Sequence, residues 1–220
     1  MCLQKMFREL DESTLIQAAK QGDLDAFNLL ILRYQDLLFN IAMRVLGDAD
    51  LAADALQCAL LSAFRKIGQL RGVALRSWLA RMVLNACYDE LRRKQRRREN
   101  PLFRVGADEE EIDSVPWLVD PTPGPEEQLE TAEWDRALQD CLLSLKPVFR
   151  VMLVMIDIEG MSYEEAAEAA GVPIGTVKSR LARARLAMRD QLQKIPGFLP
   201  DRWDPGIPQH ELVGERGTHE

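Results

Sequence analysis

The chain has 220 residues, of which 47% are hydrophobic, and its formal net charge is −7. This apolar content excludes global disorder, and the length allows one large domain or two small ones. A negative charge is unusual for a protein that binds DNA unaided, because contacts to phosphates supply most non-specific affinity. The charge is uneven, however: residues 92–98 and 178–189 are basic and residues 108–113 are acidic. We therefore expect any DNA binding to be local.

Cysteine and histidine usage gives no sign of a metal or disulfide site. No two cysteines form a C-x-x-C pair, and both histidines lie far from them in a C-terminal tail; these residues are Cys2, Cys58, Cys87, Cys141, His210 and His219. This favours structural thiols in a reducing compartment over a zinc or disulfide site. The N-terminus has no signal-peptide pattern, and no apolar run reaches the roughly 18 residues of a membrane span. We expect a cytoplasmic protein without membrane insertion, metal or cofactor.

Helical periodicity dominates residues 1–99. A helix is predicted to open at Gly22-Asp23 and end at Gly47, a second to run from about 50 to 67, and a third to continue into the basic block. The expected core positions are Phe27, Leu30, Tyr34, Leu37, Leu38, Ile41 and Val45, then Ala52, Ala55, Leu56, Ala59, Leu60, Phe64 and Ile67, then Leu75, Trp78, Leu79, Met82, Val83 and Ala86. These helices predict an N-terminal domain of three to four helices.

The periodicity fails over residues 100–127, which carry five prolines and the acidic run, so a flexible linker is predicted there. Helices resume over 128–195 with Trp134, Leu138, Cys141, Leu142 and Leu145 on one stripe, and Pro147 suits a first helical turn. Residues 196–220 hold further prolines without periodicity, and we expect them to be disordered. The predicted fold class is all-α: two small helical domains joined by an acidic, proline-rich linker, the second a four-helix domain with a helix-turn-helix.

The helix-turn-helix is predicted over residues 160–189. Ser162 and Glu165 have the S-x-x-E spacing of a capping box. Ala167, Gly171 and Val177 then supply a small residue at the helix crossing, a turn glycine and a branched apolar anchor. The following helix offers a basic face at the end that would enter a major groove, with Thr176, Lys178, Ser179, Arg183 and, further on, Arg185 and Arg189. An ordinary helical hairpin with a solvated face is the alternative, and Arg180 faces either DNA or the domain itself.

Two further stripes lie in the first domain. Asp54, Gln57 and Leu61 share the face opposite the second helix's core, where a leucine favours a docking surface over a solvated one. The third helix presents hydrogen-bond donors with an aromatic among them, at Ser77, Arg81, Asn85, Tyr88 and Arg92. Such a stripe suits single-stranded DNA, although a solvated face is an equal alternative.

Together these residues resemble the extracytoplasmic-function sigma factors, compact members of the sigma-70 family. The resemblance spans roughly residues 23–192 without the linker. It is carried by Ala53-Asp54-Ala55-Leu56-Gln57, Trp78-Leu79, the EGMSYEE run at 159–165 and, most specifically, the GTVKSRLARAR run at 175–185. It implies a non-enzymatic protein that binds core RNA polymerase and directs promoter-specific initiation.

The resemblance also implies a role for each surface. Asp54, Gln57 and Leu61 would dock on the clamp helices of the largest polymerase subunit. The 68–76 loop with Ser77, Trp78, Arg81, Asn85 and Arg92 would melt and read the minus-ten element. Thr176, Lys178, Ser179 and Arg183 would read the minus-thirty-five element as duplex, and the linker would thread toward the polymerase active-site cleft. Our own hypothesis is that its acidic run mimics nucleic acid there. An anti-sigma factor is the expected regulator. Cys58 and Leu75 depart from the family pattern, which expects an acidic and an aromatic residue there.

Two other functions stay open. A helix-turn-helix regulator would bind duplex DNA alone, and a sigma-like adaptor would dock on polymerase without reading promoters. An enzyme is the remotest possibility, since the sequence has no glycine-rich phosphate loop, no metal-ligand cluster and no histidine in either predicted domain.

Overall fold

The computed structural model describes residues 11–71, 74–99 and 125–195. Within these ranges the chain forms helices and turns without a strand, which confirms the all-α prediction. The N-terminal half holds α2 (Glu12–Lys20), α3 (Leu24–Leu46), α4 (Ala49–Lys66), a 3-10 turn η1 (Ile67–Gln69) and α5 (Leu75–Glu99). The C-terminal half holds α6 (Pro125–Ser144), α7 (Pro147–Leu153), a π-helical turn η3 (Val154–Ile158), α8 (Tyr163–Ala170) and α9 (Ile174–Leu192).

Local sequence signals set most helix boundaries where they were predicted. The Asp23 carboxylate accepts hydrogen bonds from the backbone N–H groups of Asp25 and Ala26 at 2.9 and 3.0 Å, which begins α3. Gly47 ends α3 in the left-handed region at φ +72°. Pro147 occupies the first turn of α7. Helix α6 begins at Pro125, three residues inside the predicted linker, whose residues 100–124 lie outside the described ranges, as do the acidic run and the tail.

Helix α2 was not predicted from the sequence. It is short and packs on α3, where the Tyr34 hydroxyl donates a 2.5 Å hydrogen bond to the Glu12 carboxylate. Burial, followed by this carboxylate, raises the pKa of Tyr34 to about 12. Because α2 has a single buried leucine and a single buried alanine, Leu15 and Ala19, its periodicity is too brief to recognise.

Helix α4 packs against α3 and α5 through a stripe of alanines: Ala52, Ala55, Ala59 and Ala63. The prediction that Phe64 points into the core is wrong, because Ala63 takes the inward position and Phe64 stays 37% exposed at the edge. There it meets Phe27 edge to face, with ring centroids 5.1 Å apart. The predicted core residue Trp134 is likewise 36% exposed.

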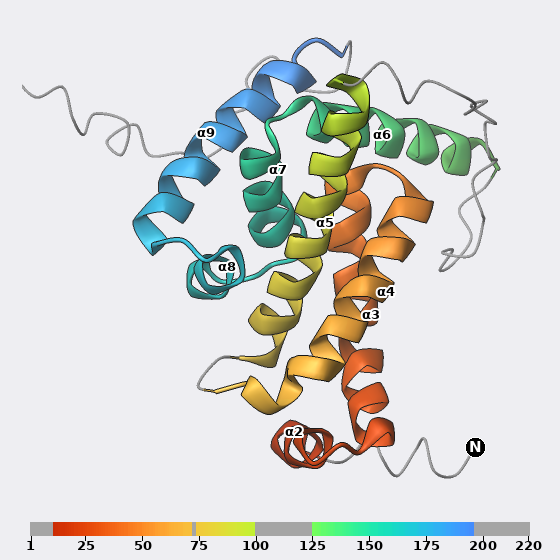
Figure 1. The fold of residues 1–220 in the computed structure, drawn as a ribbon. Helices are drawn as coiled ribbons and strands as arrows, with labels where there is room; N and C mark the ends of the chain where they lie inside the picture. The colour runs from red at the N-terminus through yellow and green to blue at the C-terminus, as the bar shows by residue number, and fades with distance from the viewer. Residues whose placement is uncertain (1–10, 72–73, 100–124, 196–220) are drawn as a thin grey trace, which may run out of the picture.

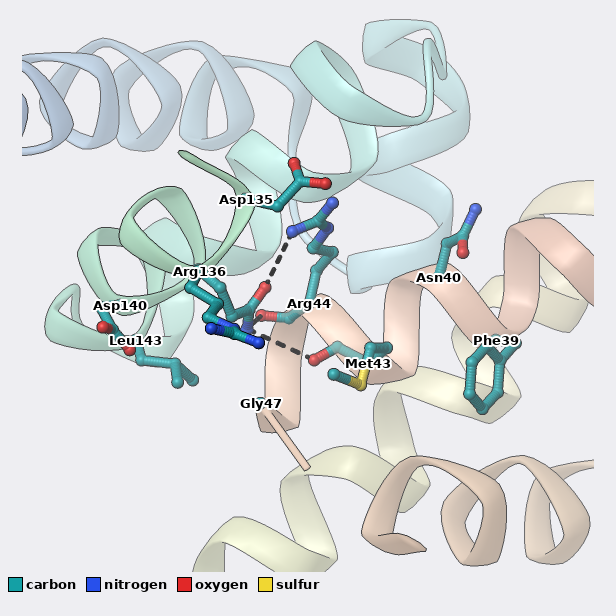
Figure 2. Close-up of a pocket in the computed structure, with 10 residues that line it drawn as sticks. Phe39, Asn40, Met43, Arg44, Gly47, Asp135, Arg136, Asp140 and Leu143 are labelled. Carbon is teal, nitrogen blue, oxygen red and sulfur yellow. Dashed lines mark hydrogen bonds between the residues drawn. The ribbon is translucent and has the colours of Figure 1, made fainter. Parts of the chain in front are cut away.

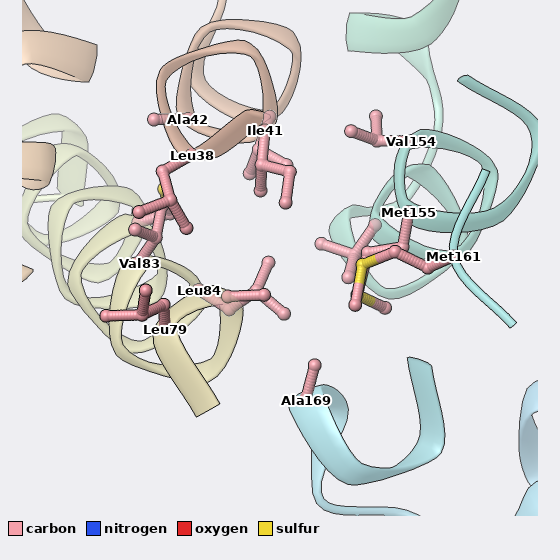
Figure 3. Close-up of a cluster of buried hydrophobic side chains, with 14 of the residues drawn as sticks. Leu38, Ile41, Ala42, Leu79, Val83, Leu84, Val154, Met155, Met161 and Ala169 are labelled. Atoms are coloured by element: carbon pink, nitrogen blue, oxygen red, sulfur yellow. The ribbon is translucent and has the colours of Figure 1, made fainter. Parts of the chain in front are cut away.

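The two halves lie against each other in this structure. Helix α5 is covered by α3 and α4 on one side and by α8 on the other (Figure 1). Leu38, Ile41 and Leu84 of the first half face Val154, Met155, Met161 and Ala169 of the second (Figure 3), and all are at most 3% exposed. Burial of this kind stabilises by about 25 cal/mol per Å² of apolar surface, so the interface contributes to the common core.

Candidate nucleic-acid interface

The helix-turn-helix forms as its sequence predicts. The Ser162 hydroxyl accepts a hydrogen bond from the Glu165 N–H at 3.1 Å, while the Glu165 carboxylate accepts one from the Ser162 N–H at 2.9 Å, completing the capping box. Gly171 ends α8 at φ +65°, a conformation that other residues reach only with strain. Ala167 and Val177 are both buried where α8 and α9 meet, which fixes the crossing of the two helices.

The first three turns of α9 present the predicted polar face to solvent. Lys178, Ser179 and Arg183 are exposed and Thr176 is half-buried. The Lys178 ammonium lies 5.9 Å from the centre of the Tyr163 ring, within range of a cation–π contact. Arg180 is half-buried, and its charge partly offsets the burial that raises the pKa of Tyr88 of α5.

The predicted donor stripe on α5 is only partly a surface. Asn85, Arg81 and Arg92 are exposed, and Trp78 is half-buried. The expectation that Ser77 lies on this surface is wrong here, because it is fully buried and its hydroxyl has no hydrogen-bond partner. The cause is helical spacing: Ser77 falls in line with Ala80, Leu84 and Cys87, which are also buried. Residues 72–73 of the predicted loop lie outside the described ranges.

The predicted docking set on α4 is exposed in full. Asp54, Gln57 and Leu61 point away from the alanine stripe, and Leu61 is 56% exposed. Cys58 is exposed beside Gln57, whereas burial raises the pKa of the Cys87 thiol to about 12. An exposed leucine flanked by hydrogen-bonding side chains is a surface that a partner protein can cover.

One end of the contact between the halves is built on the C-terminus of α3. Gln139 of α6 donates hydrogen bonds to the carbonyls of Met43 and Arg44 and accepts one from the Arg44 guanidinium at 3.2 Å. These groups line an open cavity of about 490 Å³ between α3 and α6 (Figure 2). Arg150 of α7, 5% exposed, reaches the same helix end and donates to the carbonyl of Val45.

The other end joins α5 to the α8 region. Arg76 donates to the Glu159 carbonyl at 2.6 Å and pairs with the Glu165 carboxylate at 3.2 Å. The sequence interpretation missed the linking roles of Arg76, Gln139 and Arg150. One signal for Arg150 was available: it is a lone cation inside the apolar run of α7, a placement that requires buried acceptors.

Two further findings concern metal sites and membrane spans within the described ranges. No group of three or more His, Cys, Asp or Glu side chains is placed there to hold a metal ion. No helix in residues 11–71, 74–99 or 125–195 is both long enough and apolar enough to cross a membrane.

Comparison with known proteins identifies the family. Sigma-70 region 2 matches residues 30–97, and Sigma-70 region 4 matches residues 135–188. The ECF RNA polymerase sigma-E factor of Haemophilus influenzae is 31% identical over 191 residues, covering 86% of this chain and 100% of that protein. The chain belongs to the extracytoplasmic-function sigma factors of the sigma-70 family. This sigma factor is also 36% identical over 192 residues to the ECF RNA polymerase sigma factor SigM of Mycobacterium tuberculosis, covering 87% of each.

A solved structure supports the assignment at the level of the fold. The sigma factor RpoE of Bartonella quintana, crystallised with the anti-sigma factor NepR, has a TM-score of 0.59 and 26% identity to this sigma factor. The match covers 77% of this chain and 98% of that one. Region 2 thus corresponds to α3–α5 and region 4 to α6–α9 of this sigma factor.

Proposed function

We propose that this sigma factor divides promoter recognition between three surfaces, one for polymerase and two for DNA. The α8–α9 geometry carries the proposal: a capped first helix, a left-handed turn and a second helix whose basic N-terminal turns are exposed. Thr176, Lys178, Ser179 and Arg183 read the minus-thirty-five duplex from the major groove, where each good side-chain-to-base pair contributes about 1–3 kcal/mol of discrimination.

The α4 face docks on core polymerase. Asp54 and Gln57 offer hydrogen-bonding groups around Leu61, whose exposed side chain gains most from burial. The partner is the pair of clamp helices in the largest polymerase subunit. Polymerase supplies the catalysis and most of the affinity, so the sigma factor itself needs no catalytic group. It works where the polymerase is, in the cytoplasm.

Helix α5 reads the minus-ten element as single strand through Trp78, Arg81, Asn85 and Arg92. Stacking and phosphate contacts along this face offset an unstacking cost of a few kcal/mol. Ser77 is fully buried and joins the stripe only if the packing around α5 opens. We therefore propose that residues 1–99 and 128–195 act as separable units joined through 100–127 when polymerase is bound.

An anti-sigma factor is the proposed regulator. The relative in Bartonella quintana is bound to an anti-sigma factor, and the fold is shared over most of both chains. Such a partner would compete for the docking face on α4.

Run-off transcription with purified core polymerase tests the proposal. On a genomic promoter library, adding the sigma factor should create selective start sites. Lys178→Ala with Arg183→Ala should weaken transcription from promoters that depend on the minus-thirty-five (upstream) element. Asp54→Ala with Gln57→Ala should weaken polymerase binding and so reduce transcription from every promoter. Lys146→Ala with Lys194→Ala removes equal charge from other exposed positions and should change neither result. Tight, selective duplex binding without polymerase would instead identify a free-standing regulator.

A further inference from the structure

Helix α9, the second helix of the helix-turn-helix, is held by an aspartate that lies outside the motif. The Asp157 carboxylate accepts two hydrogen bonds from Arg185 of α9, from Nη2 at 2.6 Å and from Nε at 2.9 Å. Both side chains are about one-third exposed, at 31% and 33%. A bidentate pair fixes the orientation of the guanidinium as well as its position, which a single contact does not. The pair therefore ties the middle of α9 to the helix that precedes the motif.

Asp157 reaches Arg185 from an irregular turn. It lies in the π-helical segment η3, which follows α7 directly. The wider π turn places an extra residue in the helix, and each residue of an α-helix turns the chain by about 100°. The side chains that follow the extra residue therefore face different directions than they would in a regular α-helix. Such turns are rare and are often found at functional sites.

Tyr163 connects this pair to the proposed base-reading end of α9. Lys178 lies over the Tyr163 ring, and Tyr163 contributes with Asp157, which has the larger effect, to a raised pKa of Arg185. Lys178 and Arg185 are seven residues apart and thus share one face of the helix. Asp157 and Tyr163 consequently contact two cations along one side of α9, of which Lys178 stays exposed.

We propose that Asp157 is a positioning residue for promoter recognition, acting through Arg185. The pair sets the tilt and depth at which α9 presents Lys178, Ser179 and Arg183, and it withholds Arg185 from the DNA phosphates. This inference rests on the proposed function of α9 as the reader of duplex DNA. Arg185 thus has a different role from Lys178 and Arg183, although the sequence analysis placed all three on one basic face.

The test measures holoenzyme binding to two duplexes over a range of salt concentrations. The probes are the strongest promoter from the transcription screen and the same duplex with its upstream element scrambled. Asp157→Asn should lower the ratio of the two affinities roughly tenfold, the value of one misplaced base contact. It should also steepen the dependence of log K on log salt by about 0.9, because the freed guanidinium reaches one more phosphate.

Arg185→Gln should lower the ratio in the same way but leave the salt slope unchanged, since no cation is freed. A loss of stability alone would not separate these two slopes, and thermal unfolding checks that both variants are folded. Asp140→Asn is the matched control, because it removes the same charge from an exposed position on α6, away from α9's basic residues.

The outcomes distinguish the two claims. If wild type does not prefer the intact duplex, the proposed function fails. If wild type does prefer it and Asp157→Asn matches Asp140→Asn in ratio and slope, the positioning role of Asp157 is refuted.

Discussion

The guanidinium of Arg150 donates a hydrogen bond to the backbone carbonyl of Val45, which lies 105 residues earlier in the chain. The same guanidinium donates to the carbonyls of Leu142, Leu143 and Leu145 at 2.9, 2.6 and 3.1 Å. These carbonyls lie at or next to the C-terminal ends of α3 and α6, where the last carbonyls of a helix lack the usual backbone donor; that of Leu142 also accepts a hydrogen bond from the Leu145 N–H at 3.1 Å. One buried cation thus serves two helix ends from different halves of the molecule, where it also opposes the negative pole of each helix dipole.

Arg150→Met should destabilise the protein by about 3 kcal/mol, because it keeps the apolar stem but removes the side-chain donor from the carbonyls of Val45, Leu143 and Leu145. Urea unfolding followed by circular dichroism measures this change. Arg65→Met is the control: Arg65 is exposed on α4, where a surface substitution changes stability by less than about 0.5 kcal/mol. Equal midpoints for the two variants would contradict the role given to Arg150.

Much of the fold could be predicted because local signals were strong. The Ser162–Glu165 capping box, the glycine at 171 and the apolar spacing of α3 each depend on a few neighbouring residues, and each is confirmed. The contact between the halves could not be predicted, because it depends on long-range partners. Ser77 illustrates the limit: as a polar residue in line with the buried Ala80, Leu84 and Cys87, it could face solvent or the core, and only the packing around α5 decides.

In the candidate site, too, some features could be predicted from the sequence and others could not. The exposure of Lys178, Ser179 and Arg183 follows from the helical period, so the sequence predicted it. Arg185 lies on the same helix, yet its partner Asp157 comes from a π turn that no sequence pattern indicated.

Gly47→Ala should destabilise the protein more than Gly171→Ala. Both glycines have positive φ, so each substitution costs about 1 kcal/mol in backbone strain. A Cβ at position 47 would also overlap the methyl carbons of Leu143, whereas at position 171 the nearest atom, of Arg81, is an ordinary 3.6 Å away. The clash adds about 1–3 kcal/mol. Thermal unfolding compares the two variants.

The same experiment in a Leu143→Ala background isolates the clash. Removing the leucine side chain opens space for the new methyl group, so the additional cost of Gly47→Ala should fall to that of the strain. A cost unchanged by Leu143→Ala would mean that the two halves do not approach each other at this point in solution.

Glu159 should make stability depend on pH. Burial raises the pKa of its carboxyl above the ordinary 4.5, and the positive charges of Arg76 and Arg44 offset only part of this rise. The folded protein therefore binds more protons than the unfolded chain just above pH 4.5, and the contribution of Glu159 to the free energy of unfolding falls as pH rises through that window.

Glu159→Gln should remove this contribution, so the variant gains stability relative to wild type as pH rises from about 4 to 6. The hydrogen bond from Arg76 is retained, because the acceptor is the backbone carbonyl of residue 159. Urea unfolding at several pH values measures the difference. Parallel curves for the two proteins would contradict the burial of this carboxyl.

Cys58 should react with maleimide in the folded protein well before Cys87 and Cys141. It is exposed on α4, whereas the other two are buried and burial raises the pKa of both thiols, which lowers the fraction of reactive thiolate.

Because Cys58 adjoins Gln57, a bulky maleimide there should also block binding to core polymerase. Mass spectrometry locates the label, and a Cys2→Ser background removes the remaining thiol. Cys58→Ser should bind polymerase normally after the same treatment, and undiminished binding by the labelled protein would place the docking surface elsewhere.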